Sequence, residues 1–253
     1  MIKNSLLVTA RIYKQLWGDK RFLALSVFVP LFIIYLFKVF IQEIPLAMFT
    51  DPNKFYILIT AFIIHFTSYV LCLIVIVRER REGTLTRMSV TNYSRIEIVI
   101  GYILGYAGLA TLQAVLILLE VNYFFSLNYD AVIMLKLFGI LWTLSIISIS
   151  LGIIISNLAK TEAQIFPLIP LFALPTIFLS GLIVQVERIT WLVRWIAYVI
   201  PFTYALRALE TIIPGAGVPQ YDDLISKAGE LTFLFIYGFM LLVICVLTLR
   251  KYE

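Results

Sequence analysis

Long apolar runs separated by short polar segments dominate the chain. A helix needs about 20 consecutive apolar residues to cross a bilayer, and six segments meet this requirement. The predicted spans are Phe22–Ile41, Phe55–Val77, Ile98–Val121, Ala131–Ile155, Ala163–Ile183 and Leu231–Leu249. The pattern therefore predicts an all-α integral membrane protein with six transmembrane helices.

The segment Ile2–Gly18 has helical spacing of a different kind. Leu6, Ala10, Tyr13 and Trp17 form an apolar stripe, whereas Lys3, Arg11 and Lys14 lie on another face. This pattern is typical of an amphipathic helix that lies in the membrane surface, with Trp17 and the basic residues at the level of the headgroups. A plain cytoplasmic tail is the alternative.

A seventh apolar stretch, Ile189–Ile200, is too short to span a bilayer and contains Arg194. It predicts a re-entrant or interfacial helix within residues 184–210. Span five contains Pro167, Pro170 and Pro175, and prolines that kink a span are typical of a transport pathway or of a static bend.

Composition agrees with the membrane assignment. Of 253 residues, 62% are hydrophobic and 14% are charged, whereas soluble domains carry about 45–50% apolar and about 25% charged residues. The sequence is read as a single transmembrane domain over residues 1–253, without room for a separate globular domain of about 100 residues. Cys72 and Cys245 lie inside apolar runs, so a disulfide or a metal site is not predicted.

The distribution of Lys and Arg predicts the orientation. With both termini in the cytoplasm, thirteen basic residues lie inside and seven outside, as the positive-inside rule requires. The basic residues accompany membrane spans, so a nucleic-acid partner is not expected.

Residues 78–96 form the first predicted cytoplasmic loop. Its first ten residues, Arg78–Arg87, hold six of the chain's 35 charged residues, with both signs present. Gly83 can end the preceding helix and Thr84 can cap a short helix, Leu85–Val90. Leu85, Met88 and Ser89 would then face a partner's groove. Orientation or contact with anionic lipid is the simpler alternative.

Small and polar residues add further expectations. Gly101, Gly105 and Gly108 form a row that allows close helix approach, either within the chain or at a dimer seam. Capping boxes are predicted at Ser94–Glu97 and at Thr161–Gln164.

His65 is the sole histidine and stands near Ser68. A proton relay or a serine–histidine hydrolase is conceivable, but a structural histidine is the simpler interpretation. A non-transporting scaffold is a further alternative. No GxxxxGK[ST] phosphate-binding loop occurs in the sequence, so any ATP hydrolysis is expected from another subunit.

Three motifs occur in order along the chain: Glu82-Gly83-Thr84 in the first loop, Thr91-Asn92-Tyr93-Ser94-Arg95, and a segment with Ser180-Gly181-Leu182, Trp191 and Pro201–Arg207. In these motifs the chain resembles the permeases of type-2 ATP-binding-cassette exporters. Asn92 departs from the proline that the family usually has. The resemblance covers essentially the whole chain.

The resemblance implies a multi-pass permease of the cell membrane that forms a dimer with itself or with a similar permease. Separate ATPase subunits would hold ATP and Mg, and this chain would bind no cofactor. The implied coupling residues are Arg80, Arg81, Glu82, Gly83, Thr84, Leu85, Arg87 and Met88. The implied substrate pathway comprises His65, Phe66, Tyr69, Phe172, Pro175 and Thr176, and the implied extracellular segment contains Trp191, Trp195, Pro201, Tyr204 and Arg207. The expected cargo is a hydrophobic or amphipathic drug or lipid; a polysaccharide or lipid-linked glycan is the alternative.

Overall fold

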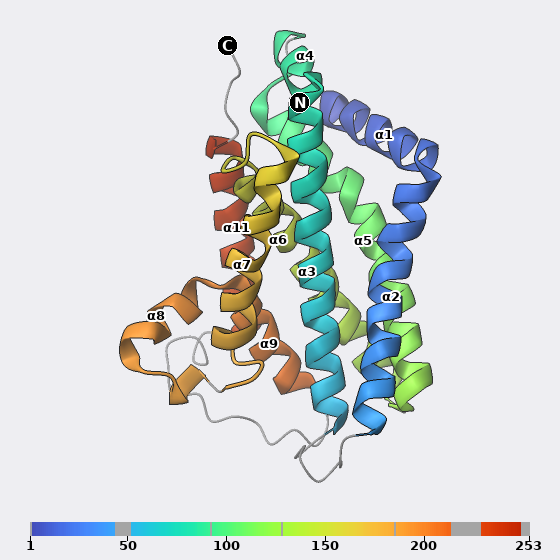
Figure 1. Cartoon of the computed structure of the whole chain (residues 1–253), viewed down its shortest axis with the longest axis vertical. Helices are drawn as coiled ribbons and strands as arrows, with labels where there is room; N and C mark the ends of the chain where they lie inside the picture. The colour runs from blue at the N-terminus through green and yellow to red at the C-terminus, as the bar shows by residue number, and fades with distance from the viewer. Residues whose placement is uncertain are drawn as a thin grey trace.

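The computed structural model describes residues 2–43, 52–91, 93–127, 129–184, 186–213 and 229–248. Within these residues the regular structure is entirely helical (Figure 1). Asn92, Lys227 and residues 249–253 lie outside them. The predicted sixth span ended within this last range, at Leu249, and the count of basic residues included Lys227, Arg250 and Lys251.

Twelve helical elements are described. They are α1 (Ile2–Gly18), α2 (Lys20–Gln42), α3 (Pro52–Arg81), α4 (Thr84–Val90), α5 (Arg95–Phe125), α6 (Ala131–Ser156), η2 (Glu162–Gln164), α7 (Ile165–Leu179), η3 (Val186–Arg188), α8 (Trp191–Val199), α9 (Pro201–Ile212) and α11 (Glu230–Thr248). Six helices are long and apolar enough to cross a membrane: α2, α3, α5, α6, η2 with α7, and α11. The prediction of an all-α membrane protein with six such helices is confirmed.

Helices α3, α5 and α6 form the centre of the bundle. About 67% of the most apolar stretch of α3 is buried, against 17% for α7 and for α11. The close contact between α3 and α6 requires Gly152, because a Cβ there would lie 2.5 Å from the carbonyl oxygen of Tyr69. Helices α7 and α11 therefore lie at the periphery and turn apolar side chains away from this chain.

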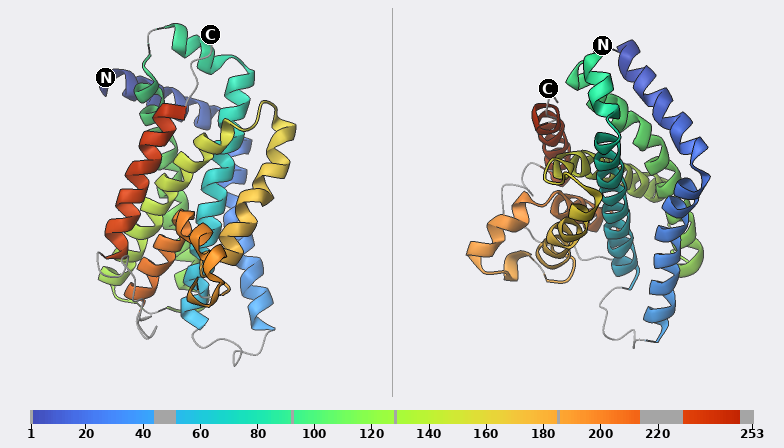
Figure 2. Two further views of the ribbon diagram at one scale, coloured as in Figure 1. Left: turned by 90° about the vertical axis from the view of Figure 1, so that its left-hand side faces the viewer. Right: turned by 45° about the horizontal axis from the view of Figure 1, so that its top comes forward.

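The two ends of the bundle differ in content. Helices α1 and α4 lie at one end together with the last turn of α3 and the first turn of α5 (Figure 1); we call this the charged end. Helices α8 and α9 lie in the opposite half (Figure 2). Residues 201–210 of α9 are all buried, so α9 forms part of the core, whereas the sequence had predicted one short helix over 189–200.

Helices α3 and α7 end at residues other than those predicted from the apolar runs. Helix α3 continues to Arg81, four residues beyond the predicted Val77, so part of the predicted loop is helical. Gly83, with φ +70°, then separates α3 from α4. Helix α7 ends at Leu179 rather than at Ile183, just before Gly181 with φ +103.

The two predicted capping boxes have different outcomes. At α5 both bonds are present, since the Ser94 hydroxyl accepts from the Glu97 N–H and the Glu97 carboxylate accepts from the Ser94 N–H. The second prediction is wrong. The Thr161 side chain makes no capping bond, and the Gln164 side chain accepts from the Lys160 N–H instead.

Candidate functional site

A buried carboxylate, Glu79, links three helices at the charged end. Its side chain is 1% exposed and lies 2.8 Å from the Arg11 guanidinium of α1. The Tyr102 hydroxyl of α5 donates a second hydrogen bond to it. A buried charge is tolerated where it is paired and hydrogen-bonded, so Glu79 joins α1, α3 and α5 at one point. We call these contacts the Glu79 network.

Sequence reasoning missed the role of Glu79 because it treated the charges of residues 78–87 as one exposed group. A signal was present: Glu79 follows Cys72, Val75 and Ile76 at helical spacing, and all three are buried. Once α3 continues to Arg81, this spacing directs the carboxylate into the bundle.

Arg80 is also turned inward. Its guanidinium donates to the Ala159 carbonyl oxygen at 3.1 Å and to Asn157 Oδ1 at 3.0 Å, beyond the carboxyl end of α6. A cation is favourable there because it complements the helix dipole and the unsatisfied carbonyl groups. Among the predicted coupling residues, Arg80 therefore connects α3 to α6.

The charges that do reach the surface lie on α4 and around its start. Arg78 Nε lies 3.2 Å from Glu82 Oε1, and Arg81 Nη1 lies 3.5 Å from Glu162 Oε1. Arg87 donates to the Glu82 carbonyl oxygen at 3.3 Å. We define the α3–α4 surface by its exposed residues, which are Arg78, Arg81, Glu82, Thr86, Arg87 and Val90. Gly83 and Thr84 are half-buried between them.

Leu85 and Met88 occupy the inner side of α4. Both are buried and pack in one hydrophobic cluster with Val8 and Ile12 of α1, and Arg11 Nη1 lies 3.6 Å from the Met88 sulfur. The expectation that these two side chains face a partner's groove is wrong, because the bundle itself covers them. They fix α4 to α1.

The glycine row of α5 is where α1 docks. A Cβ on Gly101 would lie 2.5 Å from Val8, and one on Gly105 would lie 2.8 Å from Ile12. Thr9 also donates to the Gly101 carbonyl oxygen at 3.2 Å. Of the two alternatives for the glycine row, packing within the chain and a dimer seam, the structure contains packing within the chain. Specific contacts hold α1 on α5.

The predicted pathway residues divide into two groups. Phe66 and Tyr69 of α3 lie in one cluster with Phe172 of α7, and the Tyr69 hydroxyl donates to the Ile169 carbonyl oxygen at 3.1 Å. Thr176 is buried and donates to the Phe172 carbonyl oxygen, while Pro175 is half-buried. Phe66, Tyr69 and Phe172 therefore lie at the contact between α3 and α7.

His65 points away from that group toward α6. Its Nδ1 lies 2.7 Å from Ser148 Oγ, and its ring stacks on Phe202 with 5.5 Å between centroids. The same Ser148 oxygen lies 2.6 Å from the Leu144 carbonyl oxygen of its own helix, so the His65 ring is held between α6 and Phe202. This arrangement favours a structural histidine over the pair with Ser68 that a hydrolase would use.

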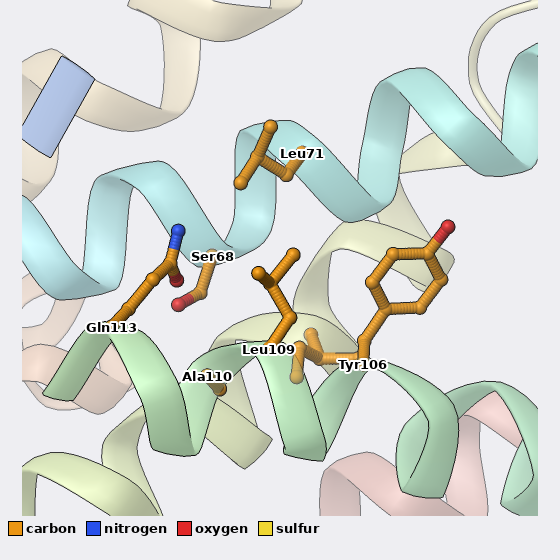
Figure 3. A pocket seen from close by; sticks show the side chains of 7 residues that line it. Ser68, Leu71, Tyr106, Leu109, Ala110 and Gln113 are labelled. Atoms are coloured by element: carbon orange, nitrogen blue, oxygen red, sulfur yellow. The ribbon is translucent and has the colours of Figure 1, made fainter. Parts of the chain in front are cut away.

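Cavities among the described residues include one between α3 and α5 and one between α6 and α11. A cavity of about 10 Å³ between α3 and α5 is lined by Ser68 and Gln113, whose polar groups lie near each other (Figure 3); it has room for about one water molecule. A second of about 260 Å³ lies between α6 and α11, beside Trp142 and Phe239. None of the predicted pathway residues lines either cavity.

At the opposite end, the predicted extracellular residues hold α8 and α9 in place. Trp191 and Trp195 are exposed on α8, and Pro201 begins α9. The Tyr204 hydroxyl donates to the Tyr198 carbonyl oxygen at 2.6 Å, and the buried Arg207 guanidinium lies 5.8 Å from the Tyr198 ring.

Lys54 of α3 lies 2.8 Å from Glu210 of α9. This ion pair ties α9 directly to the central helix α3.

Six membrane-length helices and a docked amphipathic helix define an α-helical polytopic membrane protein. Comparison with protein families agrees, since residues 4–213 match the model of the ABC-2 type transporter. The chain belongs to this family.

Several relatives carry names of the same kind. The chain is 27% identical over 177 residues to ABC transporter G family member 20 of Dictyostelium discoideum, covering 69% of this chain and 23% of that protein. It is 25% identical over 154 residues to the probable multidrug ABC transporter permease YbhS of Escherichia coli K12, covering 59% and 40%. It is 25% identical over 156 residues to the linearmycin resistance permease protein LnrN of Bacillus subtilis 168, covering 62% and 40%. The matches thus span less than half the length of each of these relatives.

Proposed function

We propose that this chain is the permease subunit of an ATP-driven exporter and that separate ATPase subunits drive it through the α3–α4 surface. The Glu79 network carries this proposal. It lies directly behind an exposed charged surface and joins α1, α3 and α5 at a single carboxylate.

The contacts give a route for movement from α4 into the membrane. Leu85 and Met88 anchor α4 to the cluster that contains α1, and Glu79 and Arg80 connect the end of α3 to α5 and α6. A partner that displaces α4 therefore acts on four helices together. Packed interfaces of this kind respond by moving as bodies rather than by local deformation.

The charged end is assigned to the cytoplasm of the cell, with both termini on that side. The distribution of Lys and Arg supports this orientation. Soluble ATPase subunits work where ATP is available, which is the side that the α3–α4 surface then faces. The plasma membrane is the proposed location.

The substrate pathway is proposed to lie between this chain and a second permease, either another copy or a similar chain. Helix α7 supports this, because it contacts α3 at Phe66, Tyr69 and Phe172 yet leaves most of its own surface outside the chain. The proposed cargo is a hydrophobic or amphipathic molecule, since two relatives are named for multidrug transport and for linearmycin resistance.

A charge reversal tests the coupling. Glu82→Arg should leave insertion and thermal unfolding unchanged, because Glu82 is exposed and surface ion pairs contribute about 0–1 kcal/mol. ATP hydrolysis by the complex purified from native membranes should fall severalfold, because the reversed charge lies on the contact with the ATPase. Hydrolysis is measured per copy of the permease.

Glu43→Arg is the control. Its side chain is also exposed, and it follows the last residue of α2 at the end of the bundle opposite the α3–α4 surface (Figure 1). Equal hydrolysis in the Glu82→Arg variant and the wild type would contradict the proposal, as would an equal loss in both variants.

A further inference from the structure

Helix α1 has a second apolar face that the bundle does not use. Its inner face, with Val8, Ile12 and Leu16, is buried. On the outer face Leu6 is 54% exposed and Trp17 is 73% exposed. Ala10 is exposed between them, whereas Tyr13, the fourth residue of the predicted apolar stripe, donates to the Leu104 carbonyl oxygen of α5 at 3.3 Å. The outer apolar face of α1 is thus formed by Leu6, Ala10 and Trp17.

Basic residues border this outer face. Lys3 and Lys14 are exposed beside the stripe, and Lys20 and Arg21 are exposed where α1 passes into α2. We call these four residues the basic rim. Arg11 is not part of it, because Glu79 holds its guanidinium.

The rim has almost no competing negative charge in its own segment. Asp19 is the single acidic residue among the first 21. Its carboxylate accepts a hydrogen bond from the Phe22 N–H at 3.0 Å and so caps α2. Four cations therefore remain for an external anionic partner.

The start of α2 sets the depth of this surface in the membrane. Helix α2 is a membrane-length helix that begins at Lys20, and α1 leads directly into it (Figure 1). A span that begins at Lys20 would place the basic rim where hydrocarbon gives way to headgroups. Tryptophan and lysine are the residues that favour this level.

We propose that the outer face of α1 and its basic rim form a binding surface for anionic phospholipid headgroups. The stripe supplies apolar contact with the acyl chains, and the rim supplies charge complementarity to the phosphates. Basic residues near an anionic membrane surface each add substantial attraction. The surface does not depend on an ATPase subunit or on a cargo, so it stands apart from the proposed exporter activity.

The contacts of α1 with α5 and with Glu79 would couple lipid binding to the interior of the bundle. Because α1 is held on the glycine row and at Glu79, a lipid that holds the outer face down also holds the Glu79 network in place. The lipid surface and the α3–α4 surface thus act on opposite sides of one helix.

Retention of lipid during release into the gas phase tests the proposal. The full chain is reconstituted in nanodiscs of equal parts phosphatidylglycerol and phosphatidylcholine, and native mass spectrometry counts each lipid that stays bound. The wild type should retain phosphatidylglycerol in excess. The triple variant Lys3→Gln, Lys14→Gln, Lys20→Gln should lose that excess, at roughly fivefold in relative affinity for each charge removed. Lys14→Gln alone should give a partial loss.

The control variant removes three exposed basic residues elsewhere, with Lys136→Gln, Lys160→Gln and Arg188→Gln. It should retain phosphatidylglycerol as the wild type does, and both variants should unfold at the wild-type temperature. An equal loss in rim and control variants would overturn the proposal. So would a rim variant that keeps the wild-type excess of phosphatidylglycerol.

Discussion

At the residue scale, Glu79 and Arg80 point into the bundle, whereas the other charged residues of the same segment are exposed. The segment Arg78–Arg87 is recognisable from composition, but its two inward residues depend on where α3 ends. Because the helix continues to Arg81, Glu79 faces the core and Arg80 faces the end of α6. The exposed remainder, with Glu82 at its centre, is the part open to another protein.

Removal of the Glu79 carboxylate should destabilise the protein measurably. Glu79→Ala eliminates two hydrogen bonds that involve a charged group and removes the carboxylate that pairs with Arg11. We expect a loss of about 2 kcal/mol in the free energy of unfolding, since Arg11 is itself 35% exposed and can reach water. Thermal unfolding in detergent with Glu82→Ala as control measures the effect. The control should lose less than about 1 kcal/mol, and equal losses would refute a special role for Glu79.

At the element scale, apolar run length identified the spans, and local chemistry moved their ends. Six runs of sufficient length predicted six membrane-length helices. A helix ends where its backbone changes rather than where apolarity stops, so α3 extends past Val77 and α7 stops before Gly181. The sequence predicted a short helix where α8 lies but none at α9, because the burial of residues 201–210 depends on tertiary packing.

Docking of α1 on the glycine row makes a prediction about a single methyl group. Gly105→Ala would place a Cβ 2.8 Å from Ile12, so α1 should loosen from α5 and its amides should exchange hydrogen faster. Gly139→Ala is the control, because nothing lies within 4 Å of its Cβ and alanine favours a helix by about 1 kcal/mol. Hydrogen exchange followed by mass spectrometry reports on α1. Unchanged exchange in Gly105→Ala would contradict close docking.

At the scale of the whole molecule, the central helices are buried, and helices at the periphery expose apolar faces. Helices α3, α5 and α6 are mostly buried, whereas α7 and α11 present apolar faces to the outside. The sequence predicted Phe66, Tyr69 and Phe172 as pathway residues; the structure brings them together between α3 and α7, and their part in a pathway stays a prediction. The sequence does not determine the rotation of each helix about its axis. His65 was therefore grouped with the pathway residues, whereas in the structure it faces Ser148 of α6. A second permease against α7 and an ATPase against α4 would complete the assembly.

The central claim is that α4 contacts an ATPase subunit, and crosslinking from Thr86 tests it most directly. Thr86 is exposed on α4, and Val132 is exposed on α6 at the opposite end. A photoreactive residue is placed at each position in turn, and the adducts formed in native membranes are identified by mass spectrometry. The account predicts that Thr86 crosslinks to a protein containing a GxxxxGK[ST] phosphate-binding loop and that Val132 does not. No such adduct from Thr86, or equal adducts from both positions, would contradict it.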